Sequence, residues 1–149
     1  MITLDTLHTN FQGGLDAIRN NTHSGFFLEG DRSPIERKEI AELLAALKEN
    51  CTLEELFLRG ITLSNQQFVD LLNAARCLKR LDLVNGFFTD FNAEEIGKAL
   101  NTSSVTTLDL TLTGIVEEQA LSVLKQLNET RRQQTFIHLW TKKVTLCTS

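Results

Sequence analysis

One short leucine pattern occurs three times along this chain of 149 residues. The three copies are Leu53-x-x-Leu56-x-Leu58, Leu78-x-x-Leu81-x-Leu83 and Val105-x-x-Leu108-x-Leu110. Each copy is followed by a turn and then by apolar residues at helical spacing. A strand-plus-helix unit of this kind cannot bury its apolar face alone, so it must stack on copies of itself. The repeat therefore predicts a solenoid with a broad exposed sheet.

Two weaker copies extend the array at its ends, Phe26-x-Leu28 and Ile137-x-Leu139. The first apolar residues of the five predicted strands are then separated by 30, 25, 27 and 29 residues. Variation of this size is absorbed in the connections between elements. We therefore expect about five strands.

The motif L-x-x-L-x-L-x-x-[N/C]-x-L is that of the leucine-rich repeat, and the chain resembles this family over about residues 24–144. It is similar to the ribonuclease-inhibitor-like subclass, whose longer repeats place an α-helix on the convex side. The resemblance implies an α/β fold, a right-handed solenoid or horseshoe arc with about five parallel strands on the concave face and helices on the convex face. The implied organisation is one domain over 1–149, with an N-terminal cap or degenerate repeat over 1–23, repeats over 24–144 and a tail over 145–149.

The chain departs from the family pattern in the column that normally holds Asn or Cys. That column contains Asp31, Ile61, Gly86, Thr113 and Lys142. We expect the side-chain hydrogen bonds that this column gives to the turn backbone to be mostly missing. The next apolar column survives as Leu63, Phe88, Ile115 and Val144. The chain is therefore interpreted as a short, divergent member.

A helix is predicted after each of the first four strands. Capping patterns mark three beginnings: Ser33-Pro34 with Glu36, Ser64 with Gln67, and Asn92 with acidic residues behind it. The residues expected on the buried helix faces are Ile40, Leu43, Leu44, Leu47, Phe68, Leu71, Leu72, Ala75, Ile96, Ala99, Leu100, Ala120, Leu121, Leu124 and Leu127. We expect residues 136–140 to close the array and residues 142–149 to form a terminal extension.

Side chains alternate between the faces of a strand, so residues between and beside the leucines should lie on the concave surface. The middle column is Phe27, Phe57, Asp82, Asp109 and His138. The column before it is Gly25, Glu55, Arg80, Thr107 and Phe136, and the column after it is Glu29, Arg59, Val84, Thr111 and Trp140. Neighbouring strands lie about 4.8 Å apart, so these residues should form one lattice.

Two aromatic residues meet in this lattice. Phe27 and Phe57 are neighbours on successive predicted strands, with Glu29 and Arg59 beside them. Exposed aromatic rings with arginine are enriched in binding hot spots, so this group is a candidate partner-binding surface. Two other interpretations are open: residues 1–23 cover the rings as a cap, or the register is in error.

Asp82 and Asp109 are also neighbours, and like charges facing each other across strands are unfavourable. Arg80, on the same face, can offset part of that repulsion. One interpretation is an acidic spot that receives Lys or Arg from a partner, and the other is a solvated polar face. Acid–base catalysis by the two carboxylates is disfavoured, because an open sheet would neither exclude water nor raise a pKa.

The last strand leaves a similar choice, since Phe136 and Trp140 form either a binding rim or a lid on the core. The residues predicted to bind a partner are Phe27, Glu29, Phe57, Arg59, Arg80, Asp82, Asp109, His138 and Trp140.

The sequence contains no phosphate-binding loop, nucleophile elbow, zinc-protease motif or dinucleotide fingerprint. The histidines and cysteines are His8, His23, His138, Cys51, Cys77 and Cys147. They are scattered and lack C-x-x-C spacing. We therefore expect no catalytic residue, no cofactor and no metal site, and we interpret the cysteines as buried or incidental thiols in a reducing compartment.

Composition, with 42% hydrophobic and 23% charged residues, is typical of one globular domain. A net charge of −4 gives no electrostatic reason to expect nucleic acid, and no run of 18 apolar residues predicts a membrane span. The first residues lack the basic segment and apolar stretch of a cleaved secretory signal. We expect a monomer.

The family resemblance implies a non-catalytic module that binds a partner protein through its concave sheet. Small leucine-rich-repeat proteins without a signal peptide include bacterial effectors, so the resemblance also implies a cytoplasmic protein or one delivered into a host cell. The alternatives are an intracellular scaffold or regulator, or an enzyme with an unrecognised site.

Overall fold

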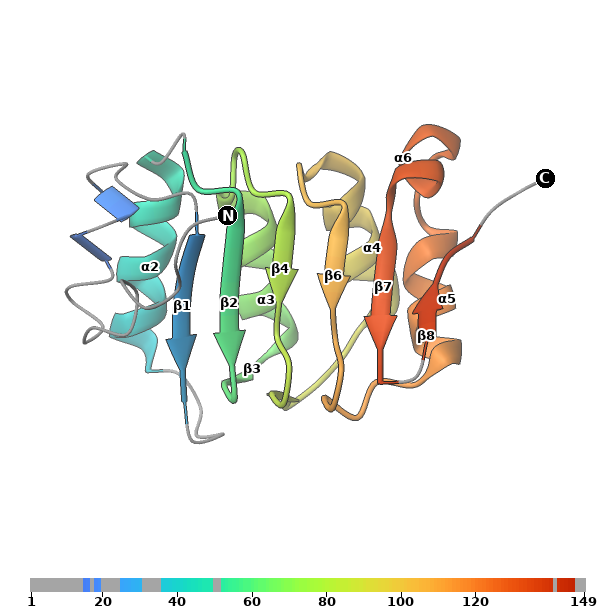
Figure 1. Ribbon diagram of the computed structural model, residues 1–149, viewed down its shortest axis with the longest axis horizontal. Helices are drawn as coiled ribbons and strands as arrows, with labels where there is room; N and C mark the ends of the chain where they lie inside the picture. The colour runs from blue at the N-terminus through green and yellow to red at the C-terminus, as the bar shows by residue number, and fades with distance from the viewer. Residues whose placement is uncertain are drawn as a thin grey trace.

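The computed structural model describes residues 15–16, 18–19, 25–30, 36–49, 52–140 and 142–146. Six strands form one sheet in the order β1-β2-β4-β6-β7-β8, and β3 and β5 form a second, two-stranded sheet. The elements are β1 (Gly25–Glu29), α2 (Arg37–Glu49), β2 (Glu55–Arg59), β3 (Thr62–Leu63), α3 (Asn65–Ala74), β4 (Arg80–Asp82), β5 (Phe87–Phe88), α4 (Ala93–Thr102), β6 (Thr107–Asp109), α5 (Glu117–Lys125), α6 (Glu129–Gln134), β7 (Phe136–Leu139) and β8 (Lys142–Val144). Figure 1 shows α2, α3, α4 and α5 side by side behind the large sheet.

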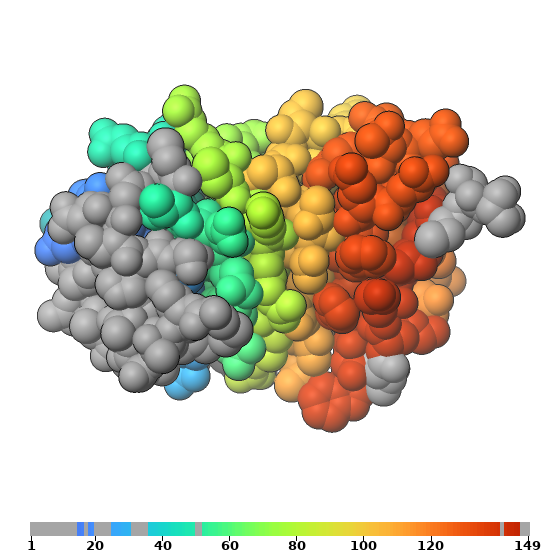
Figure 2. All heavy atoms as spheres, turned by 45° about the horizontal axis from the view of Figure 1, so that its top comes forward, coloured from blue at the N-terminus to red at the C-terminus, as the bar shows by residue number. Residues whose placement is uncertain are grey.

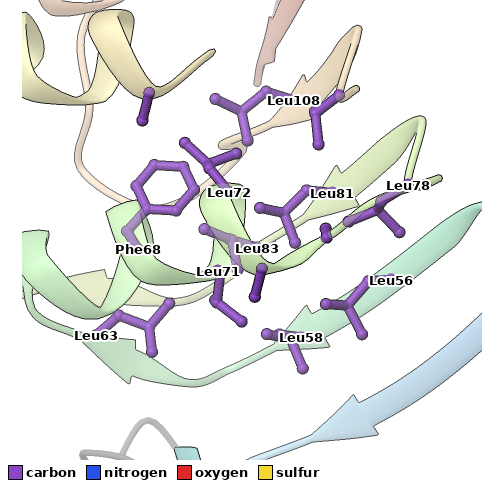
Figure 3. Close-up of a cluster of buried hydrophobic side chains, with 14 of the residues drawn as sticks. Leu56, Leu58, Leu63, Phe68, Leu71, Leu72, Leu78, Leu81, Leu83 and Leu108 are labelled. Atoms are coloured by element: carbon purple, nitrogen blue, oxygen red, sulfur yellow. The ribbon is translucent and has the colours of Figure 1, made fainter. Parts of the chain in front are cut away.

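The five predicted strands pair in parallel and in the predicted register. The residues aligned across them are Phe26, Leu56, Leu81, Leu108 and Ile137. These side chains are at most 1% exposed and point toward the helices, since they belong to the core. Figure 3 shows leucines of β2 and β4 meeting Phe68, Leu71 and Leu72 of α3. The predicted α/β class and the mostly parallel sheet are confirmed.

Two predicted helix beginnings are confirmed by their caps. The Ser64 hydroxyl accepts the Gln67 N–H at 3.1 Å, and the Gln67 side chain accepts the Ser64 N–H at 2.9 Å. Asn92 accepts the Glu95 N–H at 3.1 Å. The predicted Ser33-Pro34 cap lies outside the described residues. These bonds satisfy helical N–H groups that would otherwise lack partners, and they fix where each unit turns from strand to helix.

The turns after β2, β4 and β6 each contain a left-handed residue. Gly60, Asn85 and Leu112 hold this position in successive units, with φ of 67°, 60° and 59°. Gly and Asn adopt this conformation readily, whereas leucine does so at a cost. The prediction that side-chain hydrogen bonds to the turn backbone are mostly missing is wrong for Thr113. Its hydroxyl donates to the Leu110 carbonyl at 2.7 Å.

The C-terminal end differs from the prediction. Lys142 and Val144 do not continue a fifth parallel unit, because the chain reverses after β7 and β8 pairs with it antiparallel. Val144 lies opposite Ile137 and is 3% exposed, so β8 covers the end of the core instead of extending away from it. Helix α6 was not predicted either, because it has no buried residues and therefore no apolar period.

Arg131 of α6 connects this end to the preceding unit. Its guanidinium donates to the Leu100 carbonyl at 2.9 and 3.2 Å and also to the Val105 carbonyl. Burial lowers the pKa of Arg131, although a guanidinium keeps its charge at neutral pH. The positive charge lies near the C-terminus of α4, where the helix dipole favours it.

Gly97→Ala should lower the free energy of unfolding by about 1–2 kcal/mol, although alanine favours helix. An added Cβ would lie 2.5 Å from both the Val123 carbonyl oxygen and the Gln126 Cβ, so α4 and α5 would have to separate. Urea denaturation measures the change. Lys98→Ala, at an exposed site of the same helix, should stay within about 0.5 kcal/mol. Equal stability of wild type and Gly97→Ala would contradict the tight packing of these helices.

Candidate functional site

The described helices α2 to α5 lie on one face of the large sheet, and we call the opposite face the open face (Figure 1). Parallel sheets are usually covered on both faces. Figure 2 shows β4, β6 and β7, coloured yellow-green to red, side by side at the surface. The open face is therefore a broad region where side chains of several strands are available together.

An arginine–aspartate network crosses the open face from β2 to β6. Arg59 Nη2 donates to Asp82 Oδ2 at 3.1 Å. Arg80 Nη2 lies 3.6 Å from the same oxygen and donates to Asp109 Oδ2 at 3.3 Å. Arg80 therefore pairs with both carboxylates, in the position from which it was predicted to offset part of their repulsion. The Nε atoms of Arg59 and Arg80 are buried without an acceptor in the described part of the chain. An unsatisfied buried donor lowers the free energy of unfolding, so the network is less stabilising than its ion pairs alone suggest.

The two aspartates have local structural roles that the sequence interpretation missed. Asp82 Oδ1 accepts the Val84 N–H at 3.0 Å, and Asp109 Oδ1 accepts the Thr111 N–H at 3.0 Å. This bond to the residue two positions ahead starts a turn and ends each strand. The Asp82 side chain is 0% exposed and that of Asp109 is 14% exposed. Both predicted interpretations, an acidic spot open to a partner and a solvated face, are therefore wrong for Asp82.

The exposed pair of phenylalanine rings is also corrected. Phe27 and Phe57 are 7% and 6% exposed, with ring centroids 6.2 Å apart. The Arg59 guanidinium lies over both rings, 5.6 and 5.7 Å from their centroids, and that of Arg80 lies 5.8 Å from the Phe57 centroid. The two guanidinium groups contribute to this burial, because cations can cover aromatic faces while keeping contact with water. The predicted cap over 1–23 lies largely outside the described residues.

The open face changes character toward the C-terminus. His138 of β7 is aligned with Asp109 on one side and Lys143 on the other, and it is half-buried. Lys143 Nζ lies 4.4 Å from the Phe136 ring centroid, so this ring has a cation above it. At the opposite end of the sheet, Glu29 is exposed at the end of β1. The structure thus spreads the predicted partner-binding residues over the whole sheet, and it buries some of them.

Trp140 lies past the end of β7 and is 69% exposed, which excludes a lid on the core. It borders a shallow pocket of about 390 Å³, which we call the edge pocket. Leu112, Val116, Leu139, Trp140, Glu117 and Lys142 contribute to its lining. Glu117 and Lys142 form an ion pair of 2.8 Å. This pocket was not predicted from the sequence, because its walls come from two segments that are distant in the chain, 110–117 and 139–142.

Neither a metal site nor a membrane-spanning helix is found in the described ranges. They contain no group of His, Cys, Asp or Glu side chains placed to hold a metal ion. None of their helices is both long and apolar enough to cross a membrane. Cys77 is exposed and free. The sequence did contain one signal for the turn hydrogen bonds of Asp82 and Asp109, because each residue lies where a predicted strand ends and a turn begins.

No family model matches the chain, and no curated protein matches its sequence. Among solved structures, the fold is similar to the tropomodulin C-terminal domain of Caenorhabditis elegans, with a TM-score of 0.60 and 12% identity. The match covers 88% of this chain and 81% of that domain. The likeness supports a leucine-rich-repeat type of α/β fold and nothing finer. The assignment to the ribonuclease-inhibitor-like subclass is therefore wrong, since the structural similarity is to the tropomodulin domain and no family model supports that subclass.

Proposed function

We propose that this protein is a non-catalytic module that binds another protein through the open face. The observation that carries the proposal is the mostly parallel sheet with helices on only one of its faces among the described elements. We also propose that the stacked units form a solenoid arc, and repeat folds of this kind use their extended sheet surface for recognition.

The arginine–aspartate network supports this proposal through its rigidity. Arg59 and Arg80 are 40% and 32% exposed, yet their heads are held by Asp82, Asp109 and the phenylalanine rings. A side chain that is already ordered loses little entropy when a partner binds. Arginine is also enriched in interface hot spots. The open face thus offers partly exposed, fixed positive charge without a need for rearrangement.

The double variant Thr107→Arg with His138→Arg should reduce capture of partner proteins from lysate by tenfold or more, a loss of about 1.4 kcal/mol in binding. Both positions are half-buried on the open face, so long charged side chains there would obstruct contact without entering the core. Quantitative mass spectrometry of captured proteins measures the effect.

The matched control is Asn73→Arg with Ser122→Arg, which adds the same charge at exposed positions of α3 and α5. Partners should be retained by wild type and by this control. Equal capture by all three folded proteins, checked by circular dichroism, would remove the open face from consideration. Delivery into a host cell, a scaffold role and an unrecognised enzymatic site stay predictions of the sequence alone.

A further inference from the structure

Leu112 has a left-handed backbone conformation, which is unfavourable for a leucine. It holds the same left-handed turn position as Gly60 and Asn85 in the two preceding units, with φ of 59°. The left-handed conformation is unfavourable for a residue with a Cβ, and Asn tolerates it better than leucine does. Glycine would relieve this strain, and it would remove a side chain that is 49% exposed. Strain of this kind in a bulky residue is characteristic of functional positions.

The exposed side chain does not stand alone. Val116, which precedes α5, is 56% exposed, and Trp140 is 69% exposed. Both line the edge pocket with Leu112, and Leu139 adds apolar surface from β7. Contiguous exposed apolar surface beside a pocket of this size is typical of interaction sites. The pocket volume of about 390 Å³ could accept one or two large apolar side chains.

The charges along this edge of the sheet indicate what kind of partner fits. The turns and first helical residues after β4 and β6 carry Asp90, Glu94, Glu95, Glu117 and Glu118. The basic residues near them are Lys98, which pairs with Glu94, and Lys142, which pairs with Glu117. Acidic groups are in excess along this edge of the sheet, although of the five only Glu117 lines the pocket itself. The charge of the edge favours a cationic partner and disfavours an anionic lipid surface.

We propose that the edge pocket is a second docking site, independent of the open face, and that it binds a segment of another protein. That segment carries an apolar anchor side chain flanked by Lys or Arg. The anchor enters between Leu112, Val116 and Trp140, and the flanking cations lie against the acidic first turns of α4 and α5.

Leu112→Gly separates this role from a structural one, because it should change stability and binding in opposite directions. The free energy of unfolding should stay equal or rise, since glycine relieves the backbone, while affinity for the segment should fall at least tenfold. Asn85→Gly is the matched control, since it occupies the same turn position one unit earlier and does not line the pocket. Trp140→Ser should also weaken binding at least tenfold and leave unfolding nearly unchanged.

The probe is a library of random twelve-residue peptides displayed on phage and selected against the whole chain. The proposal expects selected peptides with Trp, Phe or Leu flanked by Lys or Arg. Their binding should persist in Asn85→Gly, fall in Leu112→Gly and Trp140→Ser, and weaken between 50 and 500 mM NaCl. Failure to select any such peptide, or equal binding to all folded variants, would overturn it.

Vesicles of phosphatidylcholine, with and without phosphatidylserine, form the second arm of the test. Sedimentation of wild type but not Trp140→Ser with either vesicle would overturn the proposal in favour of a membrane surface. The open-face variant Thr107→Arg with His138→Arg should bind the selected peptides as wild type does. This result keeps the docking site distinct from the proposed function of the open face.

Discussion

Gly60→Ala should lower the free energy of unfolding by about 3–4 kcal/mol. Two costs add at this position. Its φ of 67° is left-handed, which costs a residue with a Cβ about 1–2 kcal/mol. The new Cβ would also lie 2.5 Å from the Gly30 carbonyl oxygen, so the turns after β1 and β2 would have to separate, at about 1–3 kcal/mol more.

Gly114→Ala is the matched control for this prediction. Gly114 has φ of 86°, yet nothing lies within 4 Å of its added Cβ. It should therefore pay only the conformational cost, about 1–2 kcal/mol. Urea denaturation of both variants measures the difference, which reports the close approach of the two turns. Equal losses for Gly60→Ala and Gly114→Ala would show that the turns can move apart freely.

Asp82→Ala should lower the free energy of unfolding by about 2–4 kcal/mol. The Asp82 carboxylate is fully buried, and it accepts bonds from Arg59 and the Val84 N–H. Its removal leaves the turn N–H without its acceptor and two arginines facing each other. The loss stays below that of a completely buried ion pair, because Arg59 and Arg80 are partly exposed and can be rehydrated.

Asp82→Asn divides this loss into its parts. The amide oxygen can still accept the Val84 N–H, so the asparagine variant should lose only the charge interactions, about 1–2 kcal/mol. Glu117→Ala is the reference for an exposed pair and should cost at most about 1 kcal/mol. Chemical denaturation with urea, which leaves ionic strength constant, is the measurement. An Asp82→Ala variant as stable as Glu117→Ala would mean that the network contributes nothing to the fold.

The network also links stability to the proposed function. The same contacts that cover Phe27 and Phe57 hold Arg59 and Arg80 in place on the open face. Variants that break the network would therefore change both the fold and the surface. For this reason the binding test uses Thr107 and His138, which carry none of these contacts.

The sequence by itself determined the five parallel strands, their register and the beginnings of α3 and α4. The spacing of Leu56, Leu81 and Leu108 was sufficient, because an apolar period of two and a local cap depend on neighbouring residues alone. The sequence also placed Asp82 beside Asp109 and Arg80 near both. The column assignments followed from alternation along each strand and needed no knowledge of contacts.

Only the tertiary structure decided which of those residues are accessible. Phe27 and Phe57 alternate as surface residues do, but both are buried, with arginines of β2 and β4 against their rings. Asp82 is fully buried beside the same arginines. The reversal into β8 and the edge pocket around Trp140 likewise join segments distant in sequence. Long side chains reach across neighbouring strands, so the burial of a residue depends on where the charged ends of its neighbours find partners. The apolar period of the sequence does not contain this information.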